Sequence, residues 1–219
     1  SHWRLADVDG DRKADLVYVD TMTSKACPSG VQTRVDTFLS NGGQAWTGVT
    51  QLGCLDDLPA RDTAFQPADV NGDGRADLVG VWSRLNGDLV VYSLVSEGDG
   101  RWTTKEMLFA GADLSMQSSH WFVGDRNADG LTDLAAVATE STGTSYEVWT
   151  YDFISQGDGS WLFHPARAIR AFPSADALAW MRGDVNGDGR ADFVHRTFLP
   201  GLPTRVDTLL TTGDFTQRL

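Results

Sequence analysis

Residues 69–77 read DVNGDGRAD, and the same nine letters return at residues 184–192. Two variants of this stretch occur elsewhere, DVDGDRKAD at residues 7–15 and DRNADGLTD at residues 125–133. The first aspartates of the four copies are spaced by 62, 56 and 59 residues. A motif that returns at nearly constant spacing indicates repeated structural units. We therefore expect four related segments in this chain of 219 residues.

Each acidic stretch carries oxygen-bearing side chains at positions 1, 3, 5 and 9, counted from its first aspartate. These residues are Asp7, Asp9, Asp11, Asp15; Asp69, Asn71, Asp73, Asp77; Asp125, Asn127, Asp129, Asp133; and Asp184, Asn186, Asp188, Asp192. Main-chain carbonyl oxygens at position 7 come from Lys13, Arg75, Leu131 and Arg190. Calcium accepts six to eight oxygen ligands in flexible geometry, whereas zinc and copper favour nitrogen and sulfur donors, which these stretches lack. We therefore expect calcium loops that hold three or four Ca²⁺ ions.

The chain is strongly acidic, with 30 aspartates and glutamates, 18 lysines and arginines, and a formal net charge of −12. Thirteen of the acidic residues lie in the four loops, where they would repel one another without a cation. Four bound Ca²⁺ ions would bring the formal charge to −4. A solvated turn without metal is the alternative for any single copy.

The composition also excludes two classes of partner. Basic residues form no cluster, so the phosphate backbone of a nucleic acid would be repelled. No apolar run approaches the roughly 18 residues that span a membrane, so we expect no membrane insertion. The hydrophobic content of 41% is sufficient for a folded core.

An EF-hand loop begins in the same way, but it requires a glutamate at position 12 and a following helix. Here position 12 is Tyr18, Gly80, Ala136 or His195, and strand-like sequence follows. Position 6 is glycine in three loops, where a sharp turn favours a residue without Cβ. The first loop has Arg12 instead, so we expect it to bind Ca²⁺ more weakly, although Asp9 adds a charge there.

Each loop is followed by a run with strand-forming residues, at residues 16–19, 78–82, 134–138 and 193–196. A second run follows at residues 34–40, 89–96, 146–155 and 205–211, and then comes a glycine-containing hairpin turn. An aromatic residue stands four positions before each loop and another follows each turn. They are Trp3, Phe65, Trp121 and Trp180 before the loops, and Trp46, Trp102, Trp161 and Phe215 after the turns. The pattern of runs and turns therefore predicts four antiparallel strands in each repeat.

Four-stranded units of this length without helices are typical of β-propeller blades. We predict one all-β domain over residues 1–219, a β-propeller of four four-stranded antiparallel blades, each with a calcium loop. The blades cover approximately residues 1–60, 61–116, 117–175 and 176–219. Four hairpin modules in a sandwich are the alternative. The blades either close into a ring or belong to a longer array.

The loop pattern Asp-x-Asp/Asn-x-Asp-Gly-x-x-Asp resembles the FG-GAP or VCBS repeat over all four segments. The stretch ADVNGDGRADLV at residues 68–79 is most similar to secreted bacterial VCBS-repeat proteins. The resemblance implies an extracellular, calcium-stabilised propeller that binds glycan or protein ligands as part of a larger secreted protein. Members of this family usually have about seven blades.

In such a blade the acidic loops and the glycine turns share one face, and the remaining connections lie on the other. Cys27 and Cys54 fall on that second face of the first blade, so we expect a disulfide there. Two free buried thiols are the alternative. The connections at residues 20–33, 139–145 and 198–203 differ in length and chemistry between blades, so we expect ligands to bind on this face.

Enzymatic activity is not expected, because no G-x-S-x-G, H-E-x-x-H or phosphate-binding loop is present. A carbohydrate-active hydrolase or lyase would have to use carboxylates in the variable connections, namely Asp56, Asp57, Asp62 or Glu140. A structural spacer or shell segment of a secreted toxin is a further alternative. The tripeptide RGD at residues 182–184 ends in a predicted calcium ligand, so we do not expect it to act as an adhesive motif. We also expect Trp3, Trp121 and Trp180 to pack between blades rather than stack on sugar rings.

Overall fold

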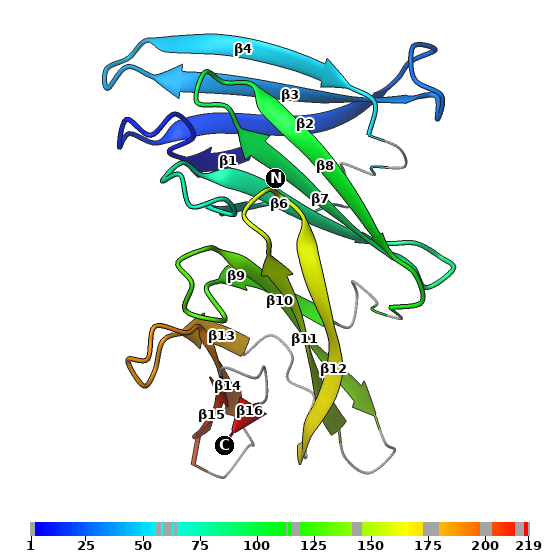
Figure 1. Cartoon of the computed structure of the whole chain (residues 1–219), viewed down its shortest axis with the longest axis vertical. Helices are drawn as coiled ribbons and strands as arrows, with labels where there is room; N and C mark the ends of the chain where they lie inside the picture. The colour runs from blue at the N-terminus through cyan, green and yellow to red at the C-terminus, as the bar shows by residue number, and fades with distance from the viewer. Residues whose placement is uncertain are drawn as a thin grey trace. The chain divides into compact units, whose positions relative to one another are not determined.

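The computed structural model describes residues 3–55, 58, 63, 65–112, 114, 119–141, 146–172, 180–197, 203–212 and 217–218. The described residues form sixteen β-strands and no helix (Figure 1). The strands pair in chain order into four antiparallel sheets of four strands each. The predicted all-β architecture of four four-stranded units is therefore confirmed.

The four sheets are named sheet 1 to sheet 4 in chain order. Sheet 1 contains β1 (Trp3–Ala6), β2 (Asp15–Thr23), β3 (Val31–Ser40) and β4 (Trp46–Gly53). Sheet 2 contains β5 (Gln66–Ala68), β6 (Asp77–Ser83), β7 (Leu89–Ser96) and β8 (Trp102–Phe109). Sheet 3 contains β9 (Ser119–Gly124), β10 (Asp133–Ser141), β11 (Tyr146–Ser155) and β12 (Trp161–Phe172). Sheet 4 contains β13 (Trp180–Gly183), β14 (Asp192–Thr197), β15 (Arg205–Thr211) and β16 (Gln217–Arg218).

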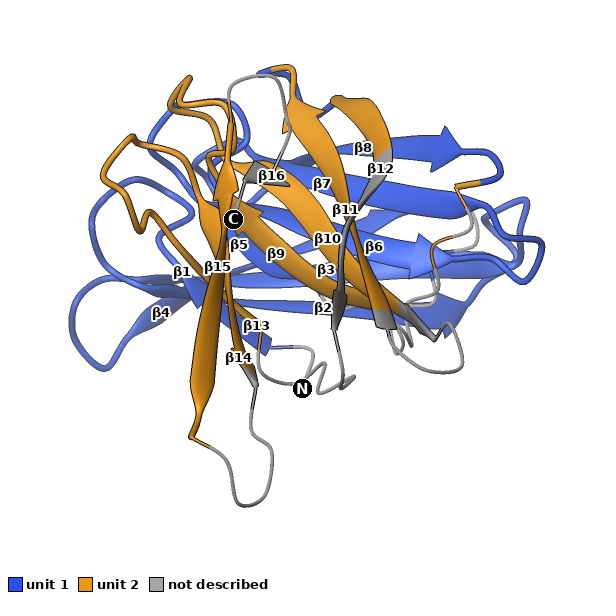
Figure 2. Ribbon diagram, turned by 90° about the horizontal axis from the view of Figure 1, so that it is seen from below, with its two compact units in different colours: residues 1–111, 157–160 blue, residues 112–156, 161–219 orange. Residues whose placement is uncertain are grey.

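The chain divides into two compact units (Figure 2). Unit 1 comprises residues 1–111 and 157–160, and it contains sheets 1 and 2. Unit 2 comprises residues 112–156 and 161–219, and it contains the strands of sheets 3 and 4. Each unit is thus built around one pair of neighbouring sheets.

The order of strands in each sheet places the loops at its two ends. Because consecutive strands are antiparallel neighbours, the acidic loop between the first two strands and the glycine turn between the last two lie at the same end. The connection between the second and third strands lies at the opposite end. In sheet 1, for example, the acidic loop joins β1 to β2 and the Ser24–Gly30 connection joins β2 to β3. The predicted arrangement of loops within each sheet is confirmed.

The core of unit 1 is formed where sheet 1 and sheet 2 face each other. Val8, Val17, Val19 and Val35 of the first repeat cluster with apolar side chains of the second. Those side chains are Phe65, Leu78, Val90, Tyr92, Leu94 and Trp102. The indole Nε1 of Trp102 donates a hydrogen bond to the hydroxyl of Thr37 over 2.9 Å. The two repeat aromatics of the second segment, Phe65 and Trp102, therefore pack between sheets.

The core of unit 2 has the same construction. Ala135, Val137 and Val148 of sheet 3 cluster with Trp180, Phe193 and Leu209 of sheet 4. Trp180 thus packs between sheets, as predicted. The side chain of Trp3 is 43% exposed, and its ring contacts among the described residues of unit 1 are with Tyr18 and Phe38 of the same sheet. Packing of Trp3 between sheets is therefore not found within the described part of unit 1.

A buried ion pair distinguishes sheet 3 from the other sheets. Arg126 is 2% exposed, and its Nε donates a hydrogen bond to Asp152 over 2.8 Å. Its Nη1 also donates to the carbonyl of Ala191 and the hydroxyl of Thr211, and the guanidinium lies 4.4 Å from the ring centroid of Phe193. Arg126 therefore joins sheet 3 to sheet 4 inside unit 2. The sequence analysis did not single it out.

Cys27 and Cys54 form a disulfide, as predicted. It ties the connection between β2 and β3 to the segment that follows β4. The predicted variable segment at residues 20–33 is shorter than expected, because β2 continues to Thr23 and β3 starts at Val31. The remaining loop, Ser24–Gly30, is closed by a hydrogen bond from the Ser24 amide to the Gly30 carbonyl over 2.9 Å.

Candidate metal sites

The four acidic loops share one backbone conformation, which the aspartate at position 1 organises. One of its carboxylate oxygens accepts the amide N–H of position 4, and the other accepts that of position 6. The donor and acceptor pairs are Gly10 and Arg12 to Asp7, Gly72 and Gly74 to Asp69, Ala128 and Gly130 to Asp125, and Gly187 and Gly189 to Asp184. The loop is therefore wrapped around this carboxylate in every repeat.

This wrapping requires positive φ angles at positions 4 and 6 of each loop. Position 6 has φ of 68° at Arg12, 80° at Gly74, 88° at Gly130 and 84° at Gly189. The prediction that position 6 forms a sharp turn is confirmed, and Arg12 adopts the same conformation despite its Cβ. Position 4 has positive φ as well, including 64° at Ala128. The positive φ at position 4 was not predicted from the sequence, although glycine occupies this position in the other three loops.

A first prediction separates backbone strain from packing in the fourth loop. Gly187 has φ of 77°, and a Cβ added there would meet no heavy atom within 4 Å. Gly183 also has open space around a Cβ, but its φ is ordinary. We expect Gly187→Ala to lower the free energy of unfolding by about 1 kcal/mol, whereas Gly183→Ala leaves it unchanged or raises it slightly. Urea denaturation of both variants checks this, and equal effects would contradict the strain argument.

The aspartate at position 9 is fully buried in every loop and links two parts of its sheet. One of its oxygens accepts the amide of position 2, and the other accepts the amide of the residue at the end of the third strand. The pairs are Val8 and Ser40 with Asp15, Val70 and Ser96 with Asp77, Arg126 and Ser155 with Asp133, and Val185 and Thr211 with Asp192, at 2.7 to 3.0 Å. These predicted ligands therefore also anchor the loop to the sheet, which the sequence analysis did not anticipate.

Burial makes two of these carboxylates difficult to ionise. It raises the pKa of Asp77 to about 6 and that of Asp133 to about 7. The backbone amides that donate to them oppose this effect, and the carboxylates at positions 1 and 5 of the same loops add to it. A bound cation would favour the ionised form of such a group. A bound divalent cation would therefore stabilise the negative charge of the buried Asp77 and Asp133 carboxylates.

A second prediction concerns the calcium-free protein. Because the folded-state pKa values of Asp77 and Asp133 lie above the ordinary value of 3.8, the folded state binds more protons than the unfolded state between these limits. The stability contributed by protonation is fully present below about pH 3.8 and is lost progressively as the pH rises to between 6 and 7. We expect the melting temperature in chelator to fall by several degrees from about pH 5 to pH 8. Scanning fluorimetry checks this, and a rising melting temperature would contradict it.

Charged side chains at positions 5 and 7 pair in three of the loops. Lys13 pairs with Asp11, Arg75 with Asp73 and Arg190 with Asp188. The third loop has Leu131 at position 7 and lacks this cation. Position 7 was predicted to offer only a carbonyl oxygen, so its side-chain role is a further finding. These exposed pairs neutralise part of the charge of the loop at position 5.

The first loop brings three carboxylates into one cluster. One oxygen each of Asp7, Asp9 and Asp15 lies within 4.8 Å of the other two. Burial is the largest cause of a raised pKa at Asp9, and the three neighbouring carboxylates add to it. Each carboxylate oxygen has two acceptor positions, so an oxygen that accepts an amide can still bind a cation. The donor set and its spacing fit a hard divalent cation.

Neighbouring loops are also joined to each other within each unit. In unit 1 the amide of Ala76 donates to the carbonyl of Asp7 over 2.7 Å. In unit 2 the amide of Ala191 donates to the carbonyl of Asp125 over 2.6 Å. Position 8 of one loop thus holds position 1 of the loop before it. A change in the conformation of one loop would therefore alter the conformation of the loop bonded to it.

Comparison with protein-family models identifies part of this architecture. Residues 6–80 match the model of the FG-GAP-like repeat, a range that contains the first loop, strands β2 to β5 and the second loop. This segment is an FG-GAP-like repeat. The predicted family is therefore confirmed for residues 6–80, whereas its extension to the third and fourth segments and the closer similarity to VCBS-repeat proteins stay predictions. A comparison with curated proteins found no match.

The tripeptide RGD at residues 182–184 overlaps the start of the fourth acidic loop. Arg182 and Gly183 lie in β13, and Asp184 accepts the amides of its own loop. The carboxylate is therefore engaged in holding the loop. An adhesive role for this tripeptide is not supported by its geometry.

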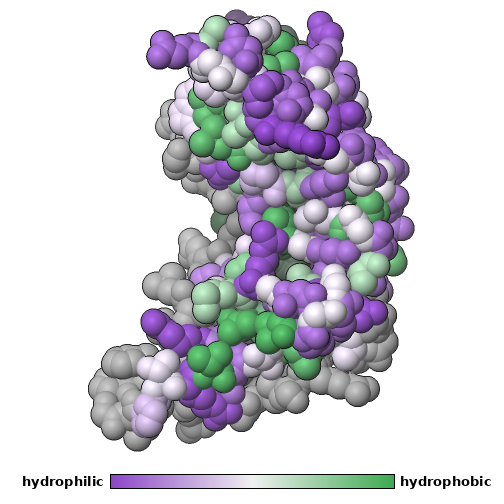
Figure 3. Space-filling view, turned by 90° about the vertical axis from the view of Figure 1, so that its left-hand side faces the viewer, coloured by the Kyte–Doolittle hydropathy of each residue, from purple (hydrophilic) through white to green (hydrophobic). Residues whose placement is uncertain are grey.

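The remaining candidates lie away from the four acidic loops. Asp56, Asp57 and Asp62, the carboxylates considered for an enzyme, fall outside the described residues, and the side chain of Glu140 does as well. The variable connections around residues 142–145 and 198–202 also fall outside them. No helix that could span a membrane occurs in the described part of the chain. The face shown in Figure 3 is largely hydrophilic, with apolar patches between the polar groups.

Proposed function

We propose that this chain is a calcium-stabilised recognition module of an extracellular protein, in which the FG-GAP-like sheets serve as propeller blades. The observation that supports it most strongly is the repeated acidic loop. The same wrapped backbone encloses the carboxylate at position 1 in all four repeats, and a fully buried aspartate closes each loop. Burying four carboxylates without counter-charge is costly, and a bound cation would remove that cost.

Calcium fits these loops better than the other common metal ions. The side chains at positions 1, 3, 5 and 9 offer only carboxylate and amide oxygens, without imidazole or thiolate. Oxygen donors of this kind suit calcium and magnesium. Calcium tolerates irregular coordination by many protein ligands, whereas magnesium demands near-ideal octahedral geometry and retains several waters. A short loop that must also satisfy its own amides favours the more tolerant ion.

The cation would supply positive charge at the point where the carboxylates converge. The residues of the chain then determine the structural consequence. Asp15 and the aspartates at position 9 of the other loops connect each loop to the end of the third strand by accepting a backbone hydrogen bond. The Ala76 amide links the second loop to the first. Ordered loops would thereby hold the sheets of each unit in register. A rigid scaffold of this kind presents connecting loops for recognition.

Glycan or protein ligands would bind at the end of the sheets opposite the acidic loops. In sheet 1 this end carries the Ser24–Gly30 loop, which the Cys27–Cys54 disulfide pins to the segment after β4. A constrained loop loses less conformational entropy on binding than a free one. Disulfides are typical of extracellular proteins, which agrees with the proposed location.

The third prediction tests calcium binding directly. Titration of chelator-treated protein, followed by calorimetry and scanning fluorimetry, is expected to show three or four Ca²⁺ sites and a rise in melting temperature that Mg²⁺ does not reproduce. Asp69→Asn should remove one site, because it takes one carboxylate from the second loop. Asp99→Asn is the matched control, since Asp99 is exposed in a glycine turn and pairs with Arg101. It should retain every site.

Two results would contradict the proposal at different levels. If no Ca²⁺ binds and the melting temperature does not change, the calcium loops are wrong and the acidic stretches are metal-free turns. If Ca²⁺ binds but the loaded protein recognises no glycan on an array and no protein ligand, the recognition role is wrong and the scaffold role remains. Binding that persists after replacement of Ser24–Gly30 by a glycine-serine linker would place recognition elsewhere.

A further inference from the structure

The two acidic loops of each unit are bonded to each other through position 1 of the loop that comes first in the sequence, called the leading loop. The leading loop is the first loop in unit 1 and the third loop in unit 2. The carboxylate of Asp7 accepts amides of its own loop, whereas its main-chain carbonyl accepts the amide of Ala76 from the second loop. Asp125 and Ala191 repeat this arrangement in unit 2. The residue that organises one loop is therefore also held by the other.

A hydroxyl group at the end of the third strand of sheet 2 adds another bond between the loops of unit 1. The Ser96 hydroxyl donates to the carbonyl of Val8, at position 2 of the first loop, over 2.5 Å. The amide of Ser96 donates to Asp77, the buried aspartate of the second loop. Ser96 is 2% exposed, so the low local dielectric strengthens both hydrogen bonds. One buried residue therefore contacts both loops.

Unit 2 contains an independent version of this junction. The Thr211 hydroxyl donates to the carbonyl of Ala191 over 2.8 Å, and the Thr211 amide donates to Asp192. The guanidinium of Arg126, at position 2 of the third loop, donates to the same carbonyl and to the same hydroxyl. The residues differ from those of unit 1, yet they again join position 2 of the leading loop to the end of the third strand in the next sheet.

The loops of a pair also approach each other closely at position 4 of the leading loop. A Cβ added at Gly10 would lie 3.3 Å from the side chain of Arg75 in the second loop. A Cβ added at Gly189 in the fourth loop would lie 3.6 Å from the Cβ of Ala128 in the third. Neither loop of a pair can therefore open without removing contacts of the other.

We propose that the two acidic loops of each unit order as one cooperative element, so that Ca²⁺ binds in pairs, to the first and second loops and to the third and fourth. Ordering a loop costs less conformational entropy when the loop bonded to it is already ordered. The affinity of each loop is therefore higher when its partner is loaded, and by linkage the two effects are equal. The pairing of the sites rests on the calcium function proposed above, whereas the coupling of order rests on the contacts between the loops.

Electrostatic repulsion between two bound ions does not oppose this pairing. The aspartates of each nine-residue loop, together with its lysine and arginine side chains, give a formal charge of −2. One Ca²⁺ neutralises this charge, so a loaded loop does not repel an ion that approaches the neighbouring loop.

Nuclear magnetic resonance of protein labelled with ¹⁵N-glycine tests the proposal, because every loop has a glycine whose amide donates to the aspartate at position 1. These reporters are Gly10; Gly72, Gly74; Gly130; and Gly187, Gly189. During Ca²⁺ titration the signals of the first and second loops should change together, as should those of the third and fourth. Asp69→Asn should weaken binding in the first loop about fivefold or more and leave the third and fourth unchanged. Asp7→Asn should weaken binding in the second loop by the same factor.

The same reporters test the coupling of order without metal. In chelator, exchange of the Gly10 amide with solvent should be faster in Asp69→Asn than in the wild type, because the second loop is loosened. Asp184→Asn, which loosens the fourth loop, should accelerate exchange at Gly130 and leave Gly10 unchanged. Each variant is therefore the control for the other.

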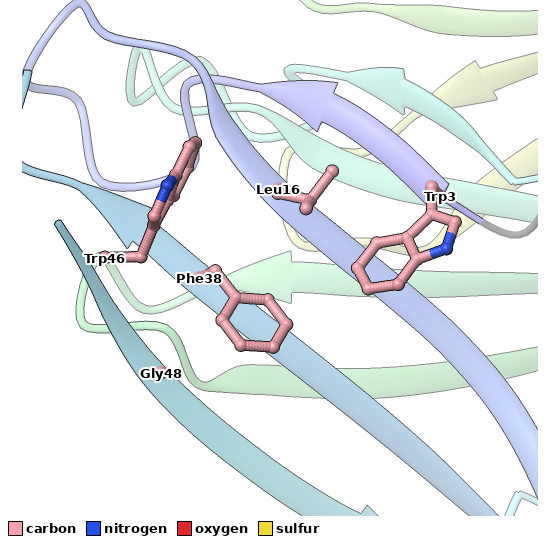
Figure 4. A pocket seen from close by; sticks show the side chains of 5 residues that line it. All are labelled: Trp3, Leu16, Phe38, Trp46 and Gly48. Atoms are coloured by element: carbon pink, nitrogen blue, oxygen red, sulfur yellow. The ribbon is translucent and has the colours of Figure 1, made fainter. Parts of the chain in front are cut away.

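Ser96→Ala tests the hydroxyl bond of unit 1, and Ser40→Ala is its matched control. Both serines end the third strand of their sheet, where Ser96 pairs with Trp102 and Ser40 with Trp46, one of the residues that line the pocket in Figure 4. Each hydroxyl accepts the amide of the glycine two positions later over 3.2 Å. Of the two, only the Ser96 hydroxyl also donates to another loop within the described part of unit 1. Ser96→Ala should accelerate Gly10 exchange about fivefold, the effect of losing one hydrogen bond, and Ser40→Ala should not.

Three results would contradict the expectation in different ways. Four independent calcium midpoints would overturn the pairing while the calcium function stands. If no loop binds Ca²⁺, the calcium function fails and the exchange rates in chelator decide the coupling, which is overturned when Gly10 does not respond to Asp69→Asn. Equal acceleration of exchange in all four loops would also overturn it, because the loops would then follow the global stability rather than their partners.

Discussion

Replacement of Arg126 by valine is expected to lower the free energy of unfolding by about 3 to 5 kcal/mol. Arg126 and Asp152 are both nearly fully buried, and the variant would leave the Asp152 carboxylate without its partner in the core of unit 2. An unpaired buried charge costs far more than the net contribution of the intact pair. The loss should appear in urea denaturation as a lower midpoint. It should also release the contact that Arg126 makes with Ala191 and Thr211 of sheet 4.

The chain itself supplies the compensating variant. The residues equivalent to Arg126 in the other repeats are Val8, Val70 and Val185, and those equivalent to Asp152 are Thr37, Ser93 and Thr208. The double variant Arg126→Val with Asp152→Thr therefore installs the pair that the other sheets use. We expect it to be more stable than either single variant, with the remaining loss due to the cavity left by the long arginine side chain.

The matched control is Arg101→Val, which removes an arginine from the exposed pair with Asp99. Exposed ion pairs contribute about 0 to 1 kcal/mol, so this variant should differ little from the wild type. If Arg126→Val were equally mild, the pair would not be buried in the way the structure describes. If the double variant were as unstable as the sum of the single variants, the two residues would not be coupled.

Reduction of the Cys27–Cys54 disulfide should produce the second large loss of stability. The bond closes a loop with a sequence separation of 27 residues. The chain-entropy treatment assigns such a loop about 3.5 kcal/mol of stabilisation, which corresponds to a decrease of roughly 10 °C in melting temperature. Leu55 and Leu58 follow Cys54 by one and four positions and belong to the core of unit 1. Reduction would therefore also loosen the attachment of these leucines.

Scanning fluorimetry with and without a reducing agent measures this effect. The variant with both cysteines replaced by alanine should melt at the temperature of the reduced wild type and should not respond to the reducing agent. A reduced protein that melts within about 2 °C of the oxidised one would show that the loop is held by its other contacts. The Ser24 to Gly30 hydrogen bond and the buried leucines are the contacts that could do so.

The aspartates of the acidic loops illustrate how far a one-dimensional pattern can be interpreted. Their spacing predicted oxygen side chains at fixed positions, and the structure places all four loops between the first two strands of a sheet. The spacing did not reveal that Asp15 and its equivalents accept amides from two separate segments. One of those amides belongs to a strand about 20 to 25 residues away along the chain, so only the folded sheet brings the two together.

Backbone conformation was accessible from the sequence only where glycine signalled it. The glycines at position 6 predicted a sharp turn, and positive φ is found there in all four loops. The positive φ at position 4 was not predicted, because this position is alanine in the third loop, at Ala128, and glycine in the other three. The left-handed conformation of Ala128 is imposed by the Asp125 carboxylate, which accepts its amide over 2.7 Å.

The sequence alone was sufficient to predict the number of repeats, the four strands of each repeat and the position of the acidic loops. These features follow from local residue patterns, because alternation, turn residues and spacing act over a few neighbouring positions. The pairing of Cys27 with Cys54 was expected only from the arrangement of loops in a blade, and the folded sheet brings the two residues together. The tertiary structure decided which aromatic residues are covered. Trp46 and Trp102 occupy equivalent positions in equivalent strands, yet one is exposed and the other buried. The difference lies in whether another sheet packs on that face, and no local pattern contains that information.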